Sequence, residues 1–277
     1  MQGLAQRATT GLLFAATMLI GIFSHQYTYL ILFLTITFLC LREFFQMTLP
    51  KGKKTDQLRK YFGFLIGLAP FLTTAYWQLL QPDTSIILAL ILGNLLLVFS
   101  AFLLELYIRS DRPFEHIAYL ILGWIYIGIP FALLNFIAIH DDQYWRWTIF
   151  AIVGINWAND SMAYLIGSRI GKTPLFPRIS PKKTWEGTIG GFLFALALAW
   201  VAIQLPGSEF NLWEWLIIAF VIALIGSLGD LVESMLKRSK QIKDSGTVLP
   251  GHGGFLDRFD GLILLIPFVL ACIVLLR

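Results

Sequence analysis

The chain has 277 residues, of which 57% are hydrophobic and only 14% are charged, and its mean hydropathy is +0.72. An ordinary globular domain has about 25% charged residues, so the composition excludes that class and predicts an all-α, polytopic integral membrane protein. The net charge of +4 is modest, and we expect no nucleic-acid partner.

Nine apolar stretches are candidates for membrane-spanning helices, each of which needs about 20 mostly apolar residues. They cover residues 9–24, 26–41, 61–80, 84–107, 117–139, 146–168, 187–205, 212–231 and 260–276. The first is not followed by a clear cleavage pattern, so we expect it to be retained. The two cysteines, Cys40 and Cys272, lie in apolar runs and predict neither a disulfide framework nor a zinc site.

The charges in the connections predict the topology. Lys and Arg gather in the connections at 42–60, 169–186 and 232–259. The connections that alternate with them are poor in Lys and Arg and carry acids: 81–83, 140–145 and 206–211. Because cytoplasmic loops carry the excess of Lys and Arg, we expect the three basic connections and the N-terminus to be cytoplasmic. We interpret the basic loop 51–60, KGKKTDQLRK, as a topology determinant at an anionic lipid surface.

The first polar cluster inside an apolar run is NWANDSMAYLIGSRIGK, residues 156–172. Asn156, Asn159 and Asp160 fall within five residues, and polar groups at membrane depth face the protein interior. We therefore expect Asp160 to lie near Lys172 or Lys182.

The second cluster is RISPKKTWEGTIGG, residues 178–191. Ser180-Pro181 predicts a turn, and Thr184 is placed to cap the following helix. Lys182 and Lys183 either bind phosphate or serve only as a positive-inside anchor.

The third cluster, GSLGDLVESMLKR, ends the eighth span. If that helix continues, Asp230, Glu233, Ser234 and Lys237 lie on one face, since they follow the i, i+3, i+4, i+7 spacing. An amphipathic helix end would explain Lys237 and Arg238 equally well. It explains Asp230 less well, because a carboxylate next to an apolar run is costly and usually has a partner or a function.

The fourth cluster is LPGHGGFLDRFDG, residues 249–261. Its glycines allow the backbone to approach a ligand closely, and such loops often bind phosphate through N–H groups. Asp257 and Asp260 share one helix face and, with Asp230, offer oxygen ligands of the kind that Mg²⁺ takes. Alternatively, both are acids that stabilise a helix N-terminus.

Acids that bind a hard metal and cations that bind phosphate are the combination that phosphoryl and nucleotidyl transfer require. The sequence has neither a G-x-x-x-x-G-K-[ST] loop nor an H-E-x-x-H motif. A site at the lipid boundary suggests a lipid substrate. We expect residues 1–110 to form N-terminal spans and residues 111–277 to form the catalytic membrane region.

The stretch SMLKRSKQIKDSGTVLPGHGGFLDRFD, Ser234 to Asp260, resembles the C-terminal motif of phosphatidate cytidylyltransferases, the CDP-diacylglycerol synthases. SPKKTWEG and NDSMAYLIGSRIGK also resemble that family, whereas the N-terminal half agrees only in being apolar. The resemblance implies an all-α, often homodimeric enzyme of a bacterial inner or plasma membrane with a cytoplasmic active site. It would convert CTP and phosphatidate to CDP-diacylglycerol and pyrophosphate, surrounded by membrane lipids.

The resemblance also implies roles for individual residues. It places Mg²⁺ at Asp230 and Asp257, in a site for two cations of which the second is unidentified. We assign catalytic roles to Asp230, Lys237, Arg238, Asp257, Arg258 and Asp260. We assign substrate binding to Asp160, Ser180, Lys182, Lys183, Thr184, Lys243, Asp244, His252, Gly253 and Gly254.

Two alternatives remain open from the sequence. One is a CTP-dependent kinase of a lipid alcohol, of the polyprenol or phytol type. The other is a transporter, although transporters place their charges near the midplane and often contain repeats, whereas most charges here lie at span ends.

Overall fold

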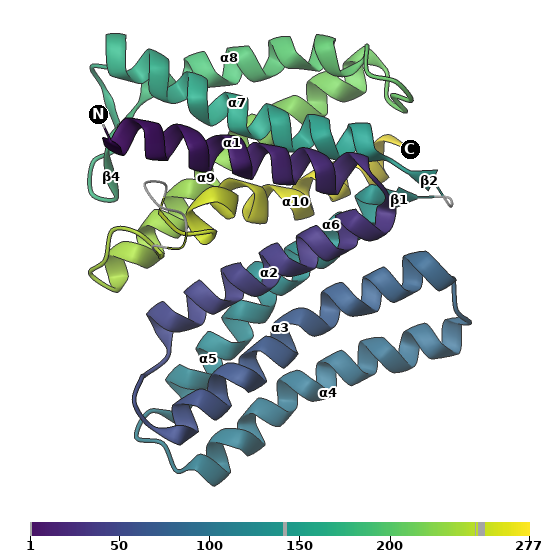
Figure 1. Ribbon diagram of the computed structural model, residues 1–277, viewed down its shortest axis with the longest axis vertical. Helices are drawn as coiled ribbons and strands as arrows, with labels where there is room; N and C mark the ends of the chain where they lie inside the picture. The colour runs from purple at the N-terminus through teal and green to yellow at the C-terminus, as the bar shows by residue number, and fades with distance from the viewer. Residues whose placement is uncertain (1, 141–142, 247, 249–252) are drawn as a thin grey trace. The chain divides into compact units, whose positions relative to one another are not determined.

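The computed structural model describes residues 2–140, 143–246, 248 and 253–277 (Figure 1). The regular secondary structure of the described residues consists of helices and two short antiparallel hairpins, β1 with β2 and β3 with β4. Its elements are α1 (Gln2–Phe23), α2 (Gln26–Thr48), α3 (Lys54–Leu80), α4 (Thr84–Ile108), α5 (Pro113–Gly123), η1 (Trp124–Gly128), α6 (Ile129–Ala138), β1 (Ile139–His140), β2 (Gln143–Tyr144), α7 (Arg146–Ile170), β3 (Pro174–Phe176), β4 (Ser180–Thr184), α8 (Trp185–Ala202), α9 (Leu212–Ser239) and α10 (Leu256–Leu276). The label η1 marks a single π-helical turn, which continues α5 into α6.

The prediction of an all-α polytopic membrane protein is confirmed. Among the described residues, eight helices are long and apolar enough to cross a membrane: α2, α3, α4, the continuous α5–η1–α6 segment, α7, α8, α9 and α10. The apolar part of α1, Thr9–Phe23, is shorter. Large apolar side chains are widely exposed, for example Leu96 (68%) and Leu103 (58%) on α4, which is the pattern expected where lipid covers the surface.

The chain divides into two compact units. Unit 1 contains Met1–Tyr144 and Asp244–Leu256, and unit 2 contains Trp145–Lys243 and Asp257–Arg277. The predicted division at residue 110 separates N-terminal spans without polar motifs from a C-terminal region that carries them. It concerns the location of the catalytic residues and stays a prediction.

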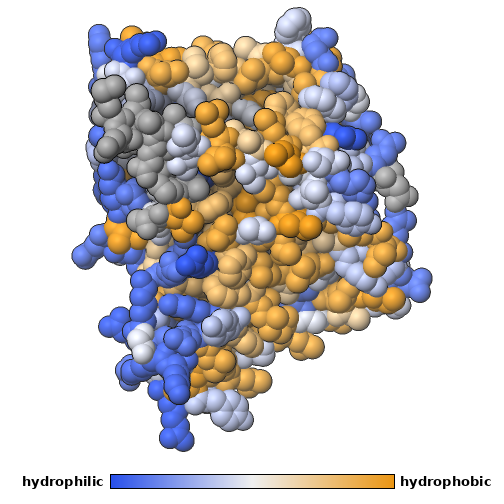
Figure 2. All heavy atoms as spheres, viewed as in Figure 1, coloured by the Kyte–Doolittle hydropathy of each residue, from blue (hydrophilic) through white to orange (hydrophobic). Residues whose placement is uncertain are grey.

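In unit 1, α3 packs against α2, α4, η1 and α6, and α3 and α4 form an antiparallel pair (Figure 1). Small residues allow this close approach: a Cβ at Gly128 would lie 2.4 Å from the backbone oxygen of Gly67, as expected where membrane helices pack through glycine. Figure 2 shows hydrophobic side chains along these helices and hydrophilic ones at the end where α2 joins α3 and α4 joins α5.

The basic stretch 51–60 differs from its prediction as a loop at the lipid surface. Helix α3 begins at Lys54, so Asp56 and Arg59 lie on its first turns and are buried. The Arg59 guanidinium pairs with Asp56 at 2.7 Å and also with Glu105 of α4. Lys51 is exposed, as the loop prediction requires. Arg59, by contrast, is buried and links α3 to α4 through its ion pair with Glu105.

In unit 2, α7 packs against α8 and α9, and α8 also packs against α9. Glycines bring α7 and α8 together, since a Cβ at Gly187 would lie 2.5 Å from the backbone oxygen of Ala163. Glycines also join α9 to α10: a Cβ at Gly229 would lie 2.8 Å from both the backbone oxygen of Asp260 and the Cα of Gly261. These contacts place the polar ends of four helices around one region.

Candidate active site

A cavity of about 580 Å³ lies within unit 2, among α7, β4, α8 and α9. This volume is within the range of about 300–1,000 Å³ that is usual for small-molecule sites. Asp160 and Tyr164 line it from α7, Lys182 to Thr184 from β4, and Ser227 and Asp230 from α9. Asp160 and Lys182 therefore line the same cavity, which is consistent with the expectation that Asp160 lies near Lys172 or Lys182, whereas Lys172 does not line it.

The β4 strand that carries the lysines is shaped by its neighbours. The turn predicted at Ser180-Pro181 is wrong, because both residues lie in β4 and the turn falls at residues 177–179. Antiparallel pairing of β3 with β4 moves the reversal upstream, with Phe176 opposite Ser180. Glu186 stabilises the base of this hairpin by accepting hydrogen bonds from the backbone N–H groups of Lys172 (3.1 Å) and Thr173 (3.1 Å).

Thr184 ends the hairpin and begins α8. Its hydroxyl oxygen accepts from the backbone N–H of Gly187 at 3.2 Å, so the predicted helix cap is confirmed. The cap fixes the direction in which the chain leaves β4 and thereby places Lys183, one residue earlier, at the cavity.

Lys183 joins β4 to α9. Its Nζ lies 2.5 Å from Oδ2 of Asp230 and donates to the backbone oxygen of Ser227 at 3.3 Å. Lys182, by contrast, is exposed at the mouth of the same cavity. The two neighbouring lysines thus differ: one is held between fixed oxygen atoms, and the other is free to reach a bound molecule from solvent.

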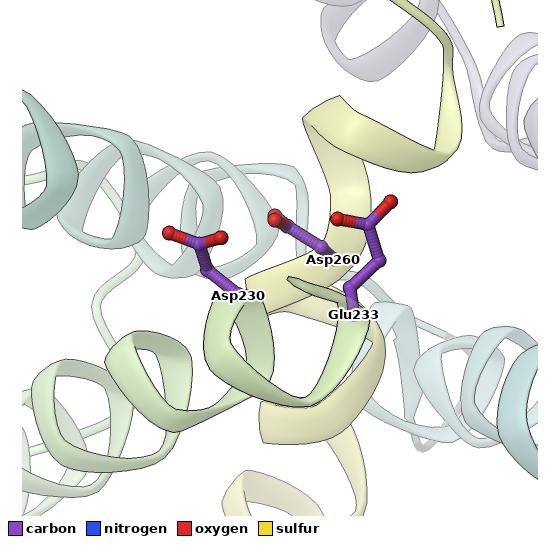
Figure 3. Close-up of side chains that lie close together, drawn as sticks. All are labelled: Asp230, Glu233 and Asp260. Atoms are coloured by element: carbon purple, nitrogen blue, oxygen red, sulfur yellow. The ribbon is translucent and has the colours of Figure 1, made fainter. Parts of the chain in front are cut away.

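Three carboxylates converge where α9 and α10 meet (Figure 3). Asp230 and Glu233 extend from α9 and Asp260 from α10, and one oxygen of each lies within 4.8 Å of the others. Glu233 is 0% and Asp260 is 9% exposed. Carboxylates this close repel one another, so the cluster is favourable only when cations balance it.

Lys237 supplies part of that balance. It pairs with Glu233, four residues earlier on α9, and with Oδ1 of Asp257 on α10 at 2.6 Å. Ser234 donates to Asp230 at 3.2 Å on the same helix. Since α9 continues to Ser239, the prediction that these polar side chains share one helix face is confirmed.

The other predicted site residues lie on α9, on β4, on α10 and in the connection between α9 and α10. Arg238 is exposed, and its guanidinium donates to the backbone oxygen of Ile242 at 3.3 Å. Ser180 is half-buried in β4, Arg258 is exposed on α10, and Lys243 and Asp244 are exposed in the connection after α9. Gly253 and Gly254 precede α10, and Gly253 has a φ of +80°, which favours glycine. His252 lies outside the described residues.

Sequence reasoning passed over two side chains that the structure places at the site. Glu233 was recognised as sharing the face of Asp230 but was not assigned a role; its i+3 spacing was the available signal. Ser227 was not noticed, because a single serine in an apolar helix is common. It lines the cavity and accepts from the Asn159 amide at 3.1 Å.

The donor set fits a hard divalent cation. Asp230, Glu233, Asp257 and Asp260 provide four carboxylates, whereas Lys183 and Lys237 provide two ammonium groups in direct contact with them. The excess negative charge and the all-oxygen ligands match the preference of Mg²⁺. Oε1 of Glu233 is buried without a hydrogen-bond partner among the described residues, and a bound cation would satisfy it.

Known proteins have sequences similar to that of this chain. The profile of the cytidylyltransferase family matches residues 5–276. A Bacillus subtilis phosphatidate cytidylyltransferase is 36% identical over 275 residues, which are 97% of each chain. A Staphylococcus saprophyticus protein of the same name is 33% identical over 84% of this chain and 85% of the relative. One from Rickettsia felis is 40% identical over 57% of this chain and 71% of the relative. The family profile covers residues 5–276, and the Bacillus subtilis relative matches along almost the whole chain, so the chain belongs to the cytidylyltransferase family.

Proposed function

We propose that the chain is a phosphatidate cytidylyltransferase, which converts CTP and phosphatidate to CDP-diacylglycerol and pyrophosphate in phospholipid biosynthesis. The observation that carries the proposal is the Lys183–Asp230 contact, which joins a phosphate-binding strand to an acidic cluster at a cavity in a membrane-helix bundle. Relatives along nearly the whole chain carry that name.

In this reaction a phosphate oxygen of phosphatidate attacks the α-phosphorus of CTP. The new bond joins that oxygen to the α-phosphorus, the bond from the α-phosphorus to the bridging oxygen breaks, and pyrophosphate leaves with the bonding electrons. Lys182 and Lys183 bind the phosphates of CTP at the cavity, and the Thr184 cap keeps their strand in place. The hydroxyl of Ser180, on the same strand, is available to a phosphate oxygen.

Asp230, Glu233 and Asp260 would hold Mg²⁺, which supplies neutralisation of the charge that develops on the phosphate oxygens. Lys237 pairs with both Glu233 and Asp257 and thereby orients their carboxylates toward the metal site. The resemblance assigns Asp257 as a ligand too, and its carboxylate lies one helical turn from Asp260. Arg258, Arg238 and Lys243 add positive charge for the substrate phosphates, and a second cation would occupy the same acidic region.

The cytoplasmic side is the proposed location of this site. The basic connections at 42–60, 169–186 and 232–259 predict that side, and it is where CTP is available. Phosphatidate would enter from the surrounding bilayer, in a bacterial inner or plasma membrane, and the enzyme would act as a homodimer.

The experiment uses purified full-length protein in detergent with phosphatidate, Mg²⁺ and CTP labelled at the α-phosphorus. Label in the lipid product together with released pyrophosphate is the expected result. Label carried into lipid only from γ-labelled CTP would instead identify a lipid-alcohol kinase. The matched control is Glu214→Gln, a change at the capping box that begins α9, which should retain activity because it lies at the other end of that helix.

A further inference from the structure

A buried carboxylate on α2 contacts the segment that leads into α10, and both belong to unit 1. Glu43 is 1% exposed. Among the described residues, its oxygens accept hydrogen bonds from the Ser245 hydroxyl at 2.8 Å, from the Phe255 N–H at 2.9 Å and from the Leu256 N–H at 2.9 Å.

These donors are neutral groups: one hydroxyl and two backbone N–H groups. A polar group without hydrogen bonds is costly to bury, so these contacts stabilise the buried position of the side chain. Two of them come from the residues at the start of α10, where the first N–H groups of a helix lack intrahelical partners. The helix dipole adds a favourable interaction with negative charge at this end.

The segment encloses the Glu43 carboxylate tightly. A Cβ at Gly246 would lie 2.5 Å from Oε1 of Glu43, and a Cβ at Gly254 would lie 2.3 Å from Oε2. Neither distance is compatible with a methyl group. The glycine at position 246 leaves the space that Glu43 occupies. The glycine at position 254 leaves the space of both Glu43 and Ser245, whose Oγ would lie 2.2 Å from the added Cβ.

We propose that Glu43 is a positioning residue that fixes the start of α10 and thereby the place of Asp257. Leu256, whose N–H binds Glu43, is the first residue of α10, and Asp257 follows it directly in the chain. Through Lys237, Asp257 is connected to Glu233 of the acidic cluster. The catalytic consequence of this proposal rests on the proposed function. The restraint that Glu43 places on the start of α10 is independent of it.

The test compares Glu43→Gln with Glu105→Gln. The first change keeps the size of the side chain but replaces one acceptor oxygen with an NH₂ group, which faces an N–H or O–H donor. The second removes a carboxylate that is equally buried in the same unit but that binds Arg59. If Glu43 acted only by stabilising unit 1, both variants would behave alike.

Hydrogen exchange, followed by mass spectrometry of the peptide 253–262, is the first readout. We expect exchange there at least about tenfold faster in Glu43→Gln than in the wild type, and unchanged in Glu105→Gln. Unchanged exchange in Glu43→Gln overturns the proposal. This readout needs no turnover, so it remains valid if the wild-type protein shows no cytidylyltransferase activity, a result that would refute the proposed function instead.

The Mg²⁺ dependence of turnover is the second readout. We expect Glu43→Gln to raise the Mg²⁺ concentration for half-maximal rate at least fivefold and to lower kcat about tenfold, with the KM for CTP changed less than twofold. Ser245→Ala combined with Glu43→Gln should be no worse than Glu43→Gln alone, because the two residues share one interaction. If Glu43→Gln alters hydrogen exchange but keeps the wild-type Mg²⁺ requirement, the catalytic role is overturned. Additive losses of activity in the double variant would overturn it too.

Discussion

Lys183 and Asp230 are 47 positions apart in the sequence, yet the ammonium nitrogen of one lies 2.5 Å from a carboxylate oxygen of the other. The contact connects the β3–β4 hairpin to the end of α9 that carries the acidic cluster. A compact ammonium fits there because it also donates to the backbone oxygen of Ser227. Lys183 is thus at once a candidate phosphate ligand and a part of the structure of the site.

The two lysines of β4 are predicted to respond differently to substitution by arginine. Arginine replaces a compact ammonium by a broad planar group, which does not fit between Asp230 and Ser227. Lys183→Arg should therefore lower kcat/KM by at least about tenfold, equivalent to about 1.4 kcal/mol of barrier, whereas Lys182→Arg, at an exposed position, should lose less than threefold. Steady-state kinetics with CTP and phosphatidate measure both. Equal, wild-type kinetics in the two variants would reduce the lysines to a topology anchor.

The acidic cluster is predicted to be indispensable for turnover. Asp230→Asn, Asp257→Asn and Asp260→Asn should each lower kcat by about 10²–10³, the order of a lost electrostatic contact to the transition state. Chelation with EDTA should abolish activity, and added Mg²⁺ should restore it. Size-exclusion profiles that match the wild type serve as the folding control. More than about a tenth of wild-type activity in any of these variants would exclude that residue as a direct metal ligand.

The three basic connections are predicted to be cytoplasmic. Single cysteines at Lys53, Lys172 and Lys240 should resist an impermeant thiol reagent added to intact cells and react in inverted membrane vesicles. Cys40 is buried and Cys272 is partly buried, so a variant in which serine replaces both gives the background. Labelling of any one position from outside would contradict the predicted topology.

The glycine contact between α9 and α10 is predicted to position the cluster. Gly229→Ala would push against the backbone of Asp260 and Gly261 and should lower both the thermal stability and kcat. Gly154→Ala on α7 is the matched control, because nothing lies within 4 Å of its added methyl group and alanine favours a helix by about 1 kcal/mol over glycine. It should keep activity and hold or raise the melting temperature. Similar melting temperatures and kinetics for the two variants would refute the prediction.

Much of this arrangement could be predicted from the sequence, because apolar length and polar spacing are local properties. The spans from α4 to α10 follow from runs of apolar residues, and the shared face of Asp230, Glu233 and Lys237 follows from helical periodicity. The ends of helices were less predictable: α3 begins at Lys54 although its first turns are charged, since Arg59 is buried in an ion pair with Glu105. That partner lies 46 residues away, and no local pattern identifies it.

In the candidate site too, local sequence patterns predicted some features, and contacts between distant residues determined the others. The resemblance pointed to Asp230 and Asp257, and helical periodicity placed Glu233 on the same face as Asp230. Pairing between elements decided what the sequence left open, namely that Lys183 and not Lys182 contacts Asp230, and that Asp257 contacts Lys237. The turn expected at Ser180-Pro181 became a strand because β3 was not foreseen as its partner. Glu43 had no local signal, because its donors Ser245, Phe255 and Leu256 come from the other end of the chain.

That separation has a consequence for biosynthesis. Glu43 is made early, but its partner Ser245 follows 202 residues later. The usual rate of chain elongation is about 5–20 residues per second. The interval between the synthesis of Glu43 and that of Ser245 is therefore roughly 10–40 seconds. During that interval the nascent protein carries a carboxylate whose later hydrogen-bond donors have not yet been synthesised. Unit 1 is therefore completed only after most of unit 2 has left the ribosome.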